Sequence, residues 1–130
     1  MHEDDLPDLT RIPSGNDICL FCGYTDLRMS VDGLASKRRY EYGTDTKNKT
    51  MLFCGRKPDR IKILYRTSSG YALLYHRYEE LKLNWPRTPE EVWIITTAQM
   101  IKLLNGYSIR REEAISYSLI RGSAKLNMVL

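Results

Sequence analysis

Basic side chains recur with tyrosines between residues 56 and 77, a combination typical of nucleic-acid-binding surfaces. Guanidinium and ammonium groups neutralise phosphates and release their counterions, while tyrosine rings stack on unpaired bases. A solvated sheet face with ordinary charges would show the same residue types, so the pattern leaves both interpretations open. The candidate nucleic-acid-binding residues are Arg56, Lys57, Arg60, Lys62, Arg66, Tyr71, Tyr75 and Arg77.

The charge balance fits a polyanionic partner and, equally well, a soluble protein with spare lysines. The chain of 130 residues carries a net charge of +4, but residues 1–17 hold five acids and one base. The rest of the chain therefore has a net charge of +8, and residues 28–66 alone hold eleven bases and four acids. A basic domain behind an acidic leader attracts polyanions, of which nucleic acid is the commonest.

A β-hairpin over residues 59–79 would bring the candidate residues together, because two alternating runs flank a Ser-Ser-Gly turn. If Thr67 pairs with Gly70, the residue numbers of every opposed pair add to 137, so that Lys62 meets Tyr75. Side chains then alternate between two faces. The expected core face carries Ile61, Ile63, Tyr65, Ala72, Leu74 and His76, and the expected exposed face carries Arg60, Lys62, Leu64, Arg66, Tyr71, Leu73, Tyr75 and Arg77.

The joint CGYTD, residues 22–26, follows a strand and precedes a helical pattern, which is where many proteins bind phosphate. It lacks the glycine, lysine and hydroxyl pattern of a Walker loop, and Asp26 at the positive end of a helix would repel an anion. Thr25 or Asp26 is a good N-cap. We therefore interpret the joint as a structural corner that starts a helix over residues 26–40.

The cysteines suggest buried thiols rather than a metal site. Cys19 and Cys22 form a CxxC, but in a strand these two residues face opposite sides and cannot chelate one ion. Cys54 and His76 could complete a ligand set only on paper, because zinc signatures usually have two close pairs. We expect no metal and no cofactor.

No catalytic constellation stands out. Asp26, Asp32 and Asp59 are a conceivable metal-binding trio for polynucleotidyl transfer. A helix cap, an exposed helix face and a turn explain the three carboxylates more simply. We therefore expect a protein that is not an enzyme and has no small-molecule substrate.

The pattern as a whole predicts a single α+β domain, with a mostly antiparallel sheet of four or five strands packed against two main helices lying side by side, 26–40 and 97–105. A Thr96-x-x-Gln99 capping box starts the second helix, and Gly106 ends it. Further strands are expected at residues 18–22, 51–54 and 90–96, and KLNW (82–85) is a candidate for another. Residues 1–10 form an acidic, disordered leader, 11–109 the domain, and 110–130 a tail with a short helix.

The compartment follows from what the sequence lacks. No apolar run reaches the ~20 residues that span a bilayer, and the acidic N-terminus lacks the apolar segment of a secretory signal. Three cysteines do not suit a disulfide scaffold. We expect a cytoplasmic protein without a membrane partner.

Six blocks of the sequence form a recognisable series: RIP (11–13), ICLFCGYTDLRMSVDGLA (18–35), LFCGRKPDRIKILY (52–65), YALLYHRYE (71–79), LNWPR (83–87) and ITTAQMIKLLNG (95–106). In this order they resemble the accessory protein of the insertion-sequence sixty-six family, the TnpB-type product of the second reading frame. This protein is unrelated to the RNA-guided nuclease of the same name. The likeness covers about residues 11–109, while the leader, the 44–50 loop, Leu27, Met29 and the 110–130 tail depart from the pattern.

The resemblance implies an accessory role in the transposition of a bacterial insertion sequence, whose third reading frame encodes the transposase. The expected partners are the DNA ends of the element and this transposase. The first hypothesis is a protein that binds DNA through the basic hairpin face. The alternative is an interaction module that docks on the transposase without binding DNA itself.

Overall fold

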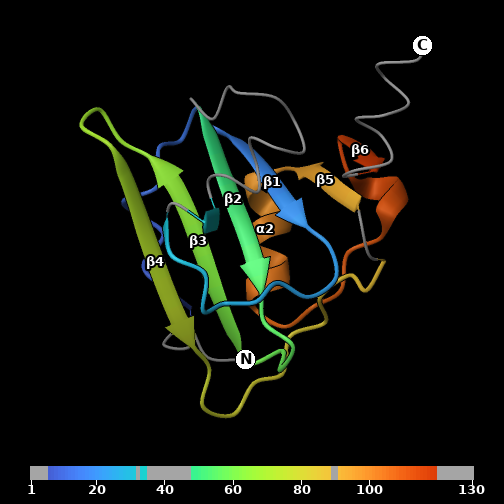
Figure 1. Ribbon diagram of the computed structural model, residues 1–130. Helices are drawn as coiled ribbons and strands as arrows, with labels where there is room; N and C mark the ends of the chain where they lie inside the picture. The colour runs from blue at the N-terminus through green and yellow to red at the C-terminus, as the bar shows by residue number, and fades with distance from the viewer. Residues whose placement is uncertain (1–5, 32, 35–47, 89–90, 120–130) are drawn as a thin grey trace.

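One mixed sheet organises the chain, with further elements packed on both of its faces (Figure 1). The computed structural model describes residues 6–31, 33–34, 48–88 and 91–119. Within them the strands lie in the order β4-β3-β2-β1-β5-β6. The elements are β1 (Asp17–Phe21), β2 (Lys49–Cys54), β3 (Arg60–Arg66), β4 (Tyr71–Arg77), β5 (Glu91–Ile95), the helix α2 (Thr97–Leu104), the 3-10 helix η2 (Arg111–Glu113) and β6 (Ser116–Leu119).

The α+β interpretation fits this arrangement, but the sheet differs from the predicted one. It has six strands in the described residues rather than four or five, and it is mixed, because β1 and β2 pair in parallel. All its other neighbouring strands are antiparallel. Both parallel strands are short, apolar and buried on both faces, which is typical of parallel strands. A short apolar run does not, however, reveal its direction.

The additional strand, β6, lies in the tail for which a short helix was expected. η2 supplies one helical turn, and β6 then pairs with β5, with Tyr117 opposite Trp93. The Arg111 guanidinium lies 3.7 Å from the centroid of the Tyr117 ring and 3.0 Å from a carboxylate oxygen of buried Glu91. Glu91 also accepts a hydrogen bond of 2.8 Å from the Trp93 indole. These long-range contacts support a strand whose own sequence is largely polar.

The predicted hairpin is confirmed residue by residue. β3 and β4 pair with Arg66 opposite Tyr71, Lys62 opposite Tyr75, and Arg60 opposite Arg77. Thr67 and Gly70 close the turn through a backbone hydrogen bond of 2.6 Å. Turn chemistry and alternation were sufficient to fix this register.

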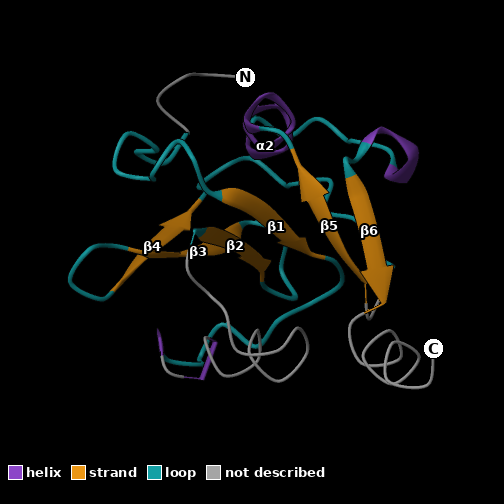
Figure 2. Ribbon diagram, turned by 90° about the horizontal axis from the view of Figure 1, so that it is seen from above, coloured by secondary structure: helices purple, strands orange, loops and turns teal. Residues whose placement is uncertain are grey.

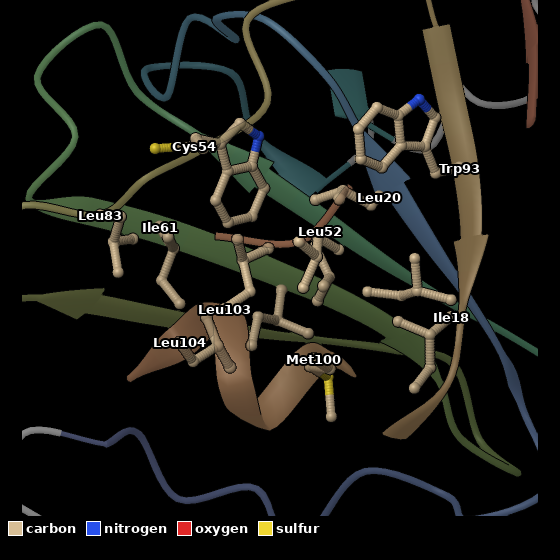
Figure 3. Close-up of a cluster of buried hydrophobic side chains, with 14 of the residues drawn as sticks. Ile18, Leu20, Leu52, Cys54, Ile61, Leu83, Trp93, Met100, Leu103 and Leu104 are labelled. Atoms are coloured by element: carbon tan, nitrogen blue, oxygen red, sulfur yellow. The ribbon is translucent and has the colours of Figure 1, made fainter. Parts of the chain in front are cut away.

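Each face of the sheet has its own core. α2 packs Met100, Leu103 and Leu104 against Leu20, Ile61 and their neighbours, and we call this cluster the α2-side core (Figure 3). The segment that follows β1 lies on the opposite face of the sheet (Figure 2). Its Leu27, Met29, Val31 and Leu34 pack against Phe53, Leu64 and their neighbours, and we call this cluster the crossover-side core. The prediction of two helices side by side on the sheet is therefore wrong, because α2 and the 27–34 segment lie on opposite faces.

The helix after the joint begins later than predicted. Among the described residues, 31, 33 and 34 are helical. Ser30 is the cap, because its hydroxyl accepts a hydrogen bond of 3.3 Å from the Gly33 N–H, and its carbonyl accepts one from Leu34. Asp26 instead caps a preceding turn by accepting from the Arg28 N–H. The expected helical residues Asp32 and 35–40 lie outside the described residues.

Two further segments pack against the α2-side core, one between β4 and β5 and one before β1. The 82–85 segment has no regular secondary structure, and no strand of the described sheet pairs with it, although Leu83 and Trp85 are buried. Buried and exposed residues alternate here because one side of the segment faces the core, and not because the segment pairs with a neighbouring strand. The prediction of a candidate strand at this position is therefore wrong. Leu6 and Leu9, from the leader expected to be disordered, also contact this core. Residues 1–5 and 120–130 lie outside the described residues.

α2 has the predicted ends. The Thr96 hydroxyl accepts from the Gln99 N–H and the Gln99 side chain accepts from the Thr96 N–H, which completes the capping box. After the C-cap Asn105, Gly106 adopts a φ of +92°. A Cβ atom at this position would lie 2.8 Å from Leu81 Cδ1. The position therefore requires glycine for both backbone and packing reasons.

We predict that Gly106→Ala lowers the free energy of unfolding by about 1–3 kcal/mol, because alanine is strained in the left-handed region. Equilibrium urea denaturation measures the change. Gly15→Ala is the matched control, because a Cβ atom there meets nothing within 4 Å and its φ lies outside the left-handed region. Equal effects of the two substitutions would contradict the assignment of Gly106 as the helix stop.

Candidate nucleic-acid interface

A groove of about 940 Å³ lies between the joint after β1 and the base of the β3–β4 hairpin. We call it the basic groove, because cations outnumber acids five to one along its walls. Its lining residues are Tyr24, Thr25, Asp26, Leu27, Arg28, Gly55, Arg56, Lys57, Arg60, Lys62, Leu73 and Tyr75.

Backbone hydrogen bonds hold the joint in place as one wall of the basic groove. The Gly23 N–H donates to the Pro86 carbonyl (2.8 Å), and the Thr25 N–H donates to the Cys54 carbonyl at the end of β2 (2.9 Å). Gly23 has a φ of +76°, which permits the sharp turn after the strand. The buried Trp85 indole donates to the Phe21 carbonyl at 2.9 Å. The wall is thus attached to the sheet on both sides.

Two of the groove's arginines have acidic partners. Arg28 makes a bidentate contact with Asp26, with Nε at 3.0 Å from Oδ1 and Nη2 at 2.8 Å from Oδ2. Hydrogen bonds from the Arg28 side chain and backbone lower the pKa of Asp26 to about 2. Arg60 pairs with Asp59 at 3.0 Å, and this side-chain hydrogen bond lowers the pKa of Asp59. Both carboxylates therefore remain charged at neutral pH and offset part of the positive charge.

Arg56 and Lys57 are exposed cations of the groove without an acidic partner in the described residues. Both side chains are exposed, and neither makes an ion pair within the described part of the chain. Both residues follow Gly55, which brings the turn close to Leu27: a Cβ atom at position 55 would lie 3.1 Å from Leu27 Cδ1. The two cations stand at the rim of the groove, where a phosphate can reach them.

Lys62 has a structural role in the groove as well as a charge. Its Nζ donates to the Met29 carbonyl at 3.1 Å and lies 5.9 Å from the centroid of the Tyr75 ring. The hydrogen bond connects the segment that follows β1 to the middle of β3. An alanine at this position would therefore change the wall of the groove and not only its charge.

Two tyrosines flank the groove with unusually exposed rings. Tyr24 is 49% exposed and Tyr75 is 52% exposed. The guanidinium of Arg87 lies 4.8 Å from the centroid of the Tyr24 ring, and that of Arg56 lies 6.0 Å from it. Each ring thus has a cation beside it.

The structure brings together five of the eight candidate residues, which are Arg56, Lys57, Arg60, Lys62 and Tyr75. Arg66 stacks on Tyr71 with 5.0 Å to the ring centroid at the turn end of the hairpin, roughly 20 Å along the strand from Arg60. Arg77 is exposed but does not line the groove.

The expected exposed face of the hairpin is only partly exposed. Leu64 is fully buried in the crossover-side core, and Leu73 and Tyr71 pack against it. The physical reason is the parallel pairing of β1 and β2, which carries the chain across this face. Sequence patterns did not reveal Tyr24, Arg28 and Arg87 as neighbours of the site, because long-range packing and not local spacing brings Tyr24 and Arg28 to the hairpin and Arg87 to Tyr24.

The cysteines follow the predicted arrangement. Cys19 belongs to the crossover-side core and Cys22 to the α2-side core, so the two lie on opposite faces of the sheet. Among the described residues no group of three or more His, Cys, Asp or Glu side chains could hold a metal ion. Burial raises the pKa of Cys54 to about 12, and burial, followed by the negative charge of Glu91, raises that of Cys22 further.

We predict that the folded protein reacts very slowly with a thiol reagent at pH 8, because buried thiols with raised pKa values supply almost no thiolate. Labelling with 5,5′-dithiobis(2-nitrobenzoic acid) measures the rate, and denaturant should release all three thiols at the rate of a free cysteine. Rapid labelling of a native thiol would contradict the burial of Cys19, Cys22 and Cys54.

These features define a small mixed-sheet protein whose two-sided core supports a basic groove flanked by tyrosines. Residues 16–114 match the family described as IS66 Orf2 like protein, and the chain therefore belongs to this family. The family places it in the context of insertion-sequence transposition. No curated protein and no solved structure matches the chain. None of the helices in the described ranges is long and apolar enough to cross a membrane.

Proposed function

We propose that this protein assists transposition by binding DNA through the basic groove. Family membership supplies the context of the proposal. The observation that carries it is the pair of exposed cations, Arg56 and Lys57, beside a groove with five cations and one acid. Such a surface gains free energy by displacing the counterions of a phosphate backbone.

The arrangement of the carboxylates supports a role without catalysis. Two of the acids that could have formed a nuclease centre have basic partners: Asp26 pairs with Arg28, and Asp59 lies near both Arg60 and Lys82. Asp32 lies outside the described residues. We therefore propose that the protein alone neither cuts nor joins DNA, and that the transposase performs these steps on the DNA ends.

We predict that Arg56→Ala combined with Lys57→Ala weakens binding to all DNA sequences, because each change removes a cation that neutralises a phosphate. The salt dependence of log K should flatten by about one unit for each phosphate that is no longer neutralised. Fluorescence anisotropy with labelled terminal DNA at several salt concentrations measures both effects. Stability should change by less than about 0.5 kcal/mol, since both side chains are exposed.

The control is Arg11→Ala combined with Lys102→Ala, which removes the same charge from exposed positions outside the groove. An equal loss of binding in both double variants would mean that net charge, and not the groove, attracts DNA. If the groove variant binds DNA like the parent but no longer associates with the transposase, the docking alternative replaces the proposal.

A further inference from the structure

The basic groove has features that a phosphate-binding surface alone does not require. We infer that it holds an unpaired segment of DNA, with bases stacked on Tyr24 and Tyr75 and phosphates on Arg56 and Lys57. This inference rests on the proposed function and specifies the form of DNA that the groove recognises. It would give the protein a role where strands separate at the ends of a mobile element.

The two exposed tyrosines are the first argument. Both rings are about half exposed and line the same groove. Aromatic rings stack on bases whose π-faces are free, and stacking of this kind tolerates any sequence. In a duplex the neighbouring base pairs cover these faces. The tyrosines therefore favour an unpaired strand over a double helix.

The apolar floor is the second argument. Leu27 and Leu73 line the groove and also pack against the crossover-side core, so the floor is a fixed part of the fold. Phosphates gain nothing from an apolar floor, whereas the apolar face of an unstacked base is buried favourably against one. The groove volume of about 940 Å³ is in the range of sites that enclose a small ligand, which suits one or two nucleotides rather than the body of a duplex.

The distribution of charge is the third argument. The only acid among the lining residues is Asp26, and its carboxylate already accepts from the Arg28 side chain and backbone. Arg87 and Arg56 lie over the Tyr24 ring, at 4.8 and 6.0 Å from its centroid, and Lys62 lies over the Tyr75 ring at 5.9 Å. Cations next to stacking platforms are the arrangement with which single-strand-binding proteins hold base and backbone together.

Three fluorescent probes of equal length test the inference at one salt concentration: a thymine oligonucleotide, the same strand with abasic sites in place of its bases, and a duplex. We expect the thymine strand to bind at least tenfold more tightly than the abasic strand and more tightly than the duplex. Tyr24→Ala and Tyr75→Ala should each weaken the thymine strand about tenfold and leave the abasic strand unchanged.

Matched variants separate stacking from other effects. Tyr24→Phe and Tyr75→Phe should bind like the parent, because the ring is sufficient for stacking. Tyr107→Ala, at another highly exposed tyrosine outside the groove, should have no effect. Far-ultraviolet circular dichroism and urea denaturation check that each variant is folded.

The outcomes distinguish the two proposals. If the duplex and the abasic strand bind as well as the thymine strand, the groove binds a phosphate backbone, so the proposed function stands and this inference is overturned. If none of the three probes binds, both fail. If alanine at Tyr24 and at Tyr75 weakens all probes equally, the rings support the groove and do not stack on bases, which also overturns the inference.

Discussion

The parallel pairing of β1 and β2 obliges the chain between them to cross one face of the sheet, because parallel neighbours cannot be joined by a tight turn. The start of this crossover lies over β2 and β3, where Leu27 and Leu34 cover Phe53 and Leu64. The same constraint gives the sheet its second core and gives the basic groove its second wall. Without the crossover, the hairpin would be a flat basic surface with a solvated face.

A few polar contacts position that wall. The Thr25 N–H reaches the end of β2 through the Cys54 carbonyl, and Lys62 on β3 reaches the Met29 carbonyl. Asp26 and Arg28 pair within the wall, while Arg60 pairs with its neighbour Asp59 at the start of β3. Paired charges thus shape the groove, and the exposed cations at its rim are the ones proposed to attract phosphate. The structural charges and the proposed binding charges are separate sets of residues.

Local sequence patterns predicted the elements that depend on interactions between residues close in the sequence. The hairpin register follows from turn residues and alternation, and the ends of α2 follow from the Thr96–Gln99 box and Gly106. The opposite placement of Cys19 and Cys22 follows from strand geometry. What could not be predicted depends on long-range pairing: the direction of two short apolar strands, and a polar strand, β6, held by β5 and by the ion pair of Arg111 with buried Glu91. The groove depends on the direction of the two apolar strands. Local patterns therefore indicated the wall that the hairpin forms, but they indicated only a structural corner where the joint after β1 forms the other wall.

The central claim is that bases in an unpaired strand lie against the tyrosines of the basic groove. Photochemical crosslinking of a 5-bromodeoxyuridine strand to the full chain, followed by mass spectrometry of the peptides, locates the bases most directly. We expect crosslinks in the peptides that contain Tyr24 and Tyr75, which come from the two walls of one groove. Crosslinks concentrated instead near Tyr107 or Tyr117, which are exposed outside the groove, would contradict the claim.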